Sequence, residues 1–123
     1  MQSPANLDCV SVDDLALPSR FKNGLAAAIN VINAMDIPTF CFTVLFGSCA
    51  SGRLKTSSDI DLLIVTKEKI LDRELRSRIR EQIDQALEAF QVSADIVFYT
   101  EQTLLTDNSV FTASLRNCGK ILT

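Results

Sequence analysis

The chain has 123 residues, of which 47% are apolar and 22% charged, and its formal net charge is −3. This length fits one domain, and the apolar content is sufficient for a continuous core without disulfides or structural metals. The acidic balance argues against a protein that coats nucleic acid, because binding to a phosphate backbone needs a cationic face. The composition therefore predicts a small folded domain without direct nucleic-acid contacts.

The residue types narrow the chemistry that the chain can perform. It contains no histidine, and its four cysteines, Cys9, Cys41, Cys49 and Cys118, are widely spaced without a C-x-x-C pair. Zinc sites with histidine ligands, Ser-His-Asp hydrolysis and Cys-His catalysis are therefore excluded. Any reaction must depend on carboxylates, hydroxyl groups, lysine or arginine.

The sequence shows no membrane or export signal. No segment approaches the roughly 20 uninterrupted apolar residues that a membrane-spanning helix needs. Residues 1–14 include acidic side chains and lack the basic start of a secretory signal. We therefore expect a cytoplasmic protein that does not contact the membrane.

The first part of the chain predicts a helix followed by a strand. Residues 1–17 are expected to be loose, and residues 18–123 to form a single domain without linkers or repeats. Apolar residues recur at helical spacing after Pro18 and predict a helix that ends at Asp36-Ile37-Pro38. Residues 40–46 are apolar and rich in aromatic side chains, which predicts a short strand buried on both faces.

A polar loop and a second strand come next. Residues 47–58 contain two glycines and four serines and are expected to form a loop, with one helical turn after Ser48. Residues 60–65 are continuously apolar apart from one acid and predict a second buried strand. Apolar positions at helical spacing from residue 71 to residue 90 then predict a long amphipathic helix.

The last part of the chain completes a mixed architecture. Residues 94–99 predict a third strand, and a final helix is expected to start at Glu101 or Ser109 and to end at Cys118. Gly119 follows this helix in the position of a left-handed C-terminal cap. The order of elements predicts an α/β (α+β) domain in which helices flank a small mixed sheet.

Two acidic residues open the second strand. Side chains alternate between the faces of a strand, so Asp59 and Asp61 point the same way, with Cα atoms about 6–7 Å apart. Their charges repel unless a cation lies between them, and Mg²⁺ is commonly held by one or two carboxylates together with substrate phosphates. An isolated D-x-D more often simply opens a strand from a solvated turn, so further features must decide.

Two such features are present. Gly47-Ser48 follows the first strand, where a glycine lets the backbone approach a ligand closely and the following amides can bind phosphate. Asp95 starts the third strand and would complete a three-carboxylate cluster if that strand pairs with the second. Taken singly, these residues are also compatible with an ordinary turn and an exposed strand start.

Together these residues carry a family resemblance. Gly47-Ser48, ten intervening residues and Asp59-x-Asp61 before an aliphatic strand resemble the signature of the DNA polymerase beta-type nucleotidyltransferase superfamily. The size and element order are similar to the minimal nucleotidyltransferases. The resemblance covers residues 40–99 and, more loosely, residues 115–122, and it implies the polymerase beta-like nucleotidyltransferase fold.

The resemblance also implies a two-metal nucleotidyl transfer with ATP as the substrate. Asp59 and Asp61 would hold two Mg²⁺ ions, and Asp95 would ligate the second ion and help to deprotonate the acceptor. Gly47 and Ser48 would contact the β- and γ-phosphates. These five residues are the predicted catalytic, metal-binding and nucleotide-binding residues.

The sequence departs from the family pattern after Gly-Ser. Family members often carry arginines where Cys49 and Ser51 stand here. Arg53 and Lys55 could contact phosphate instead, although solvated loop charges are the simpler interpretation. Cys49 could be a reactive thiol, although a loop cysteine is more often incidental.

The small size predicts that another chain supplies the acceptor, because no helical acceptor-binding domain follows the third strand. Minimal nucleotidyltransferases of this kind resemble the antitoxins of two-component systems that pair with a HEPN-type ribonuclease toxin. That resemblance implies transfer of AMP from ATP to a tyrosine hydroxyl of the toxin. Two alternatives stay open: a non-catalytic antitoxin that neutralises its partner by complex formation, and small-molecule nucleotidyl transfer with a second subunit.

Overall fold

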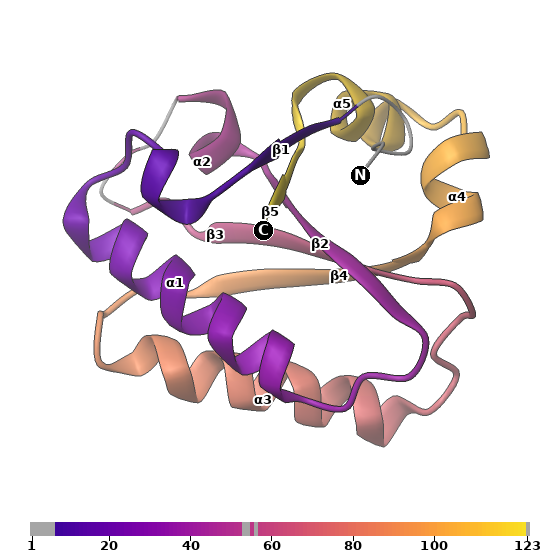
Figure 1. Ribbon diagram of the computed structural model, residues 1–123, viewed down its shortest axis with the longest axis horizontal. Helices are drawn as coiled ribbons and strands as arrows, with labels where there is room; N and C mark the ends of the chain where they lie inside the picture. The colour runs from indigo at the N-terminus through magenta and orange to yellow at the C-terminus, as the bar shows by residue number, and fades with distance from the viewer. Residues whose placement is uncertain (1–6, 53–54, 56, 123) are drawn as a thin grey trace.

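A five-stranded mixed sheet with helices on both faces forms the protein (Figure 1). The computed structural model describes residues 7–52, 55 and 57–122, and its strand order is β1-β5-β2-β3-β4. The elements are β1 (Asp8–Val10), η2 (Val12–Asp14), α1 (Ser19–Ala34), β2 (Phe40–Phe46), α2 (Ser48–Ser51), β3 (Ile60–Thr66), α3 (Arg73–Glu88), β4 (Ala94–Thr100), α4 (Glu101–Thr106), α5 (Val110–Cys118) and β5 (Lys120–Leu122). The predicted α/β class is confirmed.

Strand β3 lies within the sheet and is buried on both faces. It pairs antiparallel with β2 and parallel with β4. Ile60, Leu62 and Ile64 belong to the core that α1 and α3 cover. Leu63 and Val65 belong to a second core on the opposite face, which is completed by apolar residues of α4 and α5. Figure 1 shows α1 and α3 together on one side of the sheet.

The long helix α3 follows from its sequence pattern and from its cap. Ile79, Ile83 and Leu87 recur at helical spacing and are fully buried. The Asp72 side chain accepts hydrogen bonds from the backbone N–H groups of Glu74 (3.0 Å) and Leu75 (3.4 Å), which otherwise lack helical partners. In the described part of the chain, none of the helices has the length and apolar character required to span a bilayer.

The expectation of a loose N-terminal segment is wrong for residues 7–17. Residues Asp8–Val10 form β1, which pairs parallel with β5, and Leu7 is buried. Residues Val12–Asp14 form a 3-10 turn whose first backbone donors are capped by Ser11. A three-residue strand is too short to show an alternating pattern, and its partner is distant in the sequence. Residues 1–6 lie outside the described residues.

The predicted last helix is divided in two. Helix α4 ends at Thr106, and Asp107 then accepts hydrogen bonds from the hydroxyl groups of Ser109 and Thr112 at the start of α5. The Arg116 guanidinium donates to the backbone carbonyls of Leu104 and Asp107, both at 2.8 Å. These contacts fix the bend between the two helices.

Gly119 is not the left-handed cap that was predicted. Its φ of −68° and ψ of 153° are extended, and the chain continues directly into β5. A Cβ atom at this position would lie 2.6 Å from the carbonyl oxygen of Leu115 and 2.8 Å from Cγ1 of Val44. Glycine is needed here because α5 and β2 approach the backbone closely, not because of backbone conformation.

Gly119→Ala should therefore destabilise the fold by about 1–3 kcal/mol, the usual cost of overpacking a close contact. The free energy of unfolding is measured by urea denaturation. Cys118→Ala, at the exposed neighbouring position, is the control and should change stability little. Equal stability of Gly119→Ala and the wild type would contradict the close contact.

Candidate functional site

The pairing of β3 with β4 brings two acidic residues side by side. The two strands are parallel, and Asp61 is the direct partner of Asp95. Neighbouring strands are about 4.8 Å apart, and paired residues share one face of the sheet. Asp61 is half-buried and Asp95, on the edge strand, is exposed. The structure thus places these two predicted residues together.

Asp59 lies just before β3, two residues ahead of Asp61, and is exposed. Its carboxylate accepts a hydrogen bond from the hydroxyl of Ser93, and the backbone N–H of Ile60 donates to the carbonyl of Ser93 at 2.9 Å. Ser93 was not predicted as a site residue. The sequence did contain a signal for it: Ser93 stands two residues before Asp95, as Asp59 stands two residues before Asp61. The parallel pairing of β3 and β4 therefore brings Ser93 and Asp59 together.

Gly47 joins β2 to the helical turn α2, which confirms the predicted turn after Ser48. Its φ of 72° and ψ of −151° lie in a region that only glycine adopts readily. A Cβ atom on Gly47 would lie 2.1 Å from Oδ2 of Asp61. The carbonyl of Gly47 accepts from the N–H groups of Ala50 (3.1 Å) and Ser51 (3.0 Å). The turn and the acidic pair are therefore in direct contact.

The acidic residues influence one another. The pKa of the Asp61 carboxyl is raised to about 6, mainly by burial and in addition by the neighbouring charges of Asp95 and Asp59. Desolvation and like charges both disfavour the carboxylate form. A cation bound beside Asp61 would counter both effects, so this cluster has the electrostatic character of a metal site.

The family model described as "Polymerase beta, Nucleotidyltransferase" matches residues 32–119. The chain belongs to this family. No curated protein matches the sequence. The matched segment includes the acidic cluster and the Gly47 turn, so both lie within the nucleotidyltransferase domain.

Solved structures share the nucleotidyltransferase fold. The chain is 23% identical to a structure described as a toxin-antitoxin with AMP-PNP, with a TM-score of 0.59, over 78% of this chain and 69% of that chain. A mutant MntA-HpeT toxin-antitoxin complex gives 23% identity and a TM-score of 0.58, over 80% and 71%. The tri-AMPylated Shewanella oneidensis HEPN toxin in complex with MNT antitoxin gives 20% and 0.52, over 80% and 70%. These likenesses establish a common fold.

The donor set of this nucleotidyltransferase domain suits a hard divalent cation. Asp59, Asp61 and Asp95 offer only carboxylate oxygens, the ligands that Mg²⁺ prefers. As the side chains lie, no three acidic or cysteine residues in the described ranges are grouped closely enough to hold one ion together. Asp59 is turned toward Ser93.

Cys49 and Ser51, which stand where family members often carry arginines, differ in burial. Cys49 is buried at 4% exposure, and its thiol lies 3.9 Å from the carbonyl oxygen of Asp59, to which it donates. Burial, reinforced by the charge of Asp61, raises the pKa of Cys49 to about 11, so the thiol stays protonated and is not a reactive nucleophile. Ser51 and Lys55 are exposed, and Arg53 lies outside the described residues.

The raised pKa of Asp61 predicts a pH-dependent stability. The folded pKa of about 6 exceeds the unfolded value of about 3.9, so folding takes up a proton, and stability is lost as pH rises through that window. In buffer with a chelator, Asp61→Asn should match the wild type near pH 4 and exceed it above about pH 7. The expected gain is about 1 kcal/mol, because this partly exposed carboxylate is screened by solvent.

Urea denaturation across this pH range measures the difference. Asp84→Asn, which removes an equal charge from the exposed face of α3, is the control and should show no such pH dependence. If the wild type and Asp61→Asn keep the same difference in stability from acid to neutral pH, the pKa of Asp61 is not raised by burial and neighbouring charges.

Gly47→Ala should be strongly destabilising, by at least about 2 kcal/mol, because the new Cβ is strained and meets the Asp61 carboxylate. Gly52→Ala is the control: its φ is also positive, at 79°, but no atom of the described residues lies within 4 Å of the added Cβ. Its cost should be about 1 kcal/mol, from backbone conformation alone. Thermal or urea denaturation compares the two, and equal losses would refute the contact.

Proposed function

We propose that this nucleotidyltransferase is an antitoxin that transfers AMP from ATP to a tyrosine hydroxyl of a HEPN-type ribonuclease toxin. The observation that carries the proposal is the pairing of Asp61 with Asp95 directly beside the Gly47 turn. Because the reaction consumes ATP, we place it in the cytoplasm.

In this proposal Asp59, Asp61 and Asp95 hold two Mg²⁺ ions. Ions held there would stabilise the charge on the two oxygens of an in-line displacement at the α-phosphorus: the acceptor oxygen that forms the new bond, and the oxygen of the pyrophosphate that leaves. Asp95 accepts the proton of the acceptor hydroxyl. Burial and the neighbouring carboxylates raise the pKa of Asp61 and so disfavour its charged form, and a bound cation would offset that cost.

Gly47 and Ser48 bind the triphosphate. Because Gly47 has no side chain, its backbone lies directly against the Asp61 carboxylate, so a phosphate bound by the turn would be close to a metal ion held by Asp61. The first N–H groups of a helical turn have no acceptor within that turn, and we expect those at the start of α2 to donate to phosphate oxygens. To join this centre, the Asp59 carboxylate would have to turn from the Ser93 hydroxyl, which is its hydrogen-bond partner in the structure.

The position of Asp95 favours a macromolecular acceptor. Strand β4 is at the edge of the sheet, and Asp95 is exposed at its start, so a hydroxyl carried by a second protein can reach it from solvent. Two structural neighbours fit this picture: one is described with AMP-PNP, and another holds a tri-AMPylated HEPN toxin with its MNT antitoxin.

Transfer of label from α-³²P-ATP to the protein encoded beside this chain tests the proposal. Asp59→Asn with Asp61→Asn should reduce the rate by at least about a hundredfold, because the charges that hold the metals are removed. Asp84→Asn, which removes one exposed carboxylate on α3, is the control and should retain the wild-type rate. Undiminished labelling by the double variant would disprove the assigned centre.

A second candidate is a non-catalytic antitoxin that neutralises its toxin by complex formation. It is favoured by the missing arginines: the Cys49 side chain is buried in the core, and Ser51 carries no charge toward a phosphate. Neutralisation of the partner in cells by the Asp59→Asn, Asp61→Asn variant distinguishes the two. Full neutralisation supports binding alone, and its loss with retained complex formation supports catalysis.

A further inference from the structure

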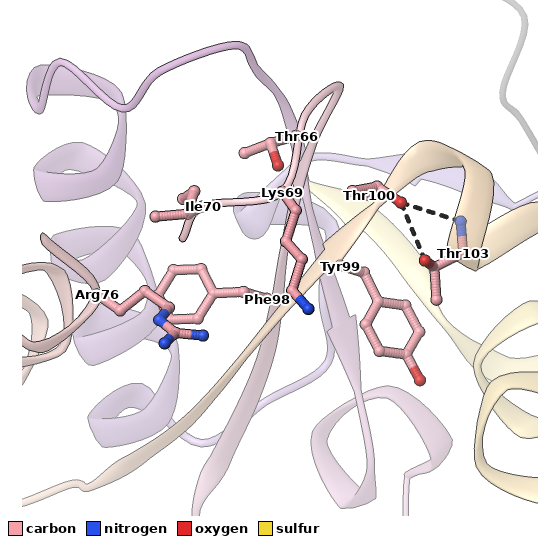
Figure 2. Close-up of a pocket in the computed structure, with 8 residues that line it drawn as sticks. All are labelled: Thr66, Lys69, Ile70, Arg76, Phe98, Tyr99, Thr100 and Thr103. Atoms are coloured by element: carbon pink, nitrogen blue, oxygen red, sulfur yellow. Dashed lines mark hydrogen bonds between the residues drawn. The ribbon is translucent and has the colours of Figure 1, made fainter. Parts of the chain in front are cut away.

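A separate cavity lies at the opposite end of β3 and β4 from the acidic pair (Figure 2). We call it the distal cavity, and its volume is about 230 Å³. Thr66 and Thr100 are paired at this end, five residues beyond the Asp61–Asp95 pair on each strand. At about 3.3 Å per residue, the two pairs are about 16 Å apart. The distal cavity is therefore distinct from the Gly47 turn.

Two cations reach the distal cavity from different elements. Lys69 comes from the loop after β3, and Arg76 comes from α3. Figure 2 shows Lys69 extending toward Phe98 and Tyr99, with the Arg76 guanidinium beside the Phe98 ring. No carboxylate is among the described residues that line the cavity, and none of them forms an ion pair with either cation. Their charges are available to a ligand.

Another arginine of α3 is already engaged. The Arg80 guanidinium lies 4.9 Å from the centroid of the Phe98 ring and donates to the carbonyl of Ile96 at 3.4 Å. It does not line the distal cavity. Arg76, one turn earlier, has no comparable contact within the part of the chain that is described, so the two arginines have different roles.

Hydroxyl groups add a hydrogen-bond donor. Thr100 Oγ1 and Thr103 Oγ1 lie 2.9 Å apart, and Thr100 Oγ1 also accepts from the backbone N–H of Thr103 at 3.1 Å (Figure 2). The two hydroxyls share one hydrogen bond, so the second hydroxyl proton is free for an acceptor in the cavity. Ile70 and Phe98 supply apolar walls on the other side.

We propose that the distal cavity binds the phosphate group of a small phosphate monoester. A phosphate dianion has three acceptor oxygens, which match the guanidinium, the ammonium and a threonine hydroxyl. The apolar walls of Ile70 and Phe98 contact the carbon part of the ligand. The volume is below the ~300–1,000 Å³ of pockets for larger ligands, so a complete nucleotide does not fit. The site does not depend on Asp59, Asp61 or Asp95.

Inorganic phosphate, phenyl phosphate and acetate are titrated into the full ¹⁵N-labelled chain, with a chelator and at constant ionic strength. Saturable amide shifts are expected for residues 66–70 and 98–103, with phenyl phosphate tightest and acetate weakest. Lys69→Gln and Arg76→Gln should each weaken phenyl phosphate binding by at least about tenfold. Arg78→Gln removes an exposed cation of α3 outside the cavity and should leave binding unchanged.

Several outcomes overturn the proposal: no saturable shifts, equal weakening by Arg78→Gln, or shifts centred on residues 47–51. Acetate binding as tight as phosphate would overturn it in favour of a site for carboxylate side chains of a partner. If Arg76→Gln does not fold, the exposed Lys69→Gln decides alone. Asp59→Asn with Asp61→Asn should keep phenyl phosphate binding, so failure of the proposed transferase reaction leaves this result interpretable.

Discussion

The parallel pairing of β3 with β4 is the constraint on which the site depends. Its register makes Asp61 the neighbour of Asp95 and turns both side chains to one face. Strand side chains alternate, so a slip of one residue would send Asp95 to the opposite face. The register is held because β3 is buried on both sides, and a shift would misplace its apolar side chains in two cores.

The same packing makes the site electrostatically unfavourable in the absence of a cation. Asp61 is partly removed from water next to two other carboxyls, and its pKa rises to about 6. The Gly47 backbone, part of the turn that we propose to bind phosphate, lies in contact with this charge. The fold therefore maintains an arrangement that a divalent ion and a triphosphate would stabilise, as expected for a preorganised site.

Different charged side chains lie at the acidic pair and at the distal cavity. Asp61 and Asp95 lie at one end, whereas Lys69 and Arg76 lie at the other. The proposed metal centre and the distal cavity therefore carry side chains of opposite charge. A chain with a net charge of −3 can in this way offer the anion site that we propose. The edge position of β4 leaves Asp95 accessible to an acceptor on a second protein.

The sequence by itself determined the features that depend on local pattern. The apolar runs predicted β2, β3 and β4, helical spacing predicted α1 and α3, and the Gly-Ser and D-x-D spacing indicated the nucleotidyltransferase family that the family model confirms. These properties follow from residues that are near one another in the chain.

Only the tertiary structure decided the features that depend on distant contacts. Strands β1 and β5 have three residues each and acquire their structure from each other and from β2. Gly119 is required by the approach of Val44 and Leu115, and Ser93 becomes a partner of Asp59 through the β3–β4 pairing. The distal cavity likewise joins a loop, α3 and β4. Such contacts bring together residues far apart in the chain, and no local pattern specifies them.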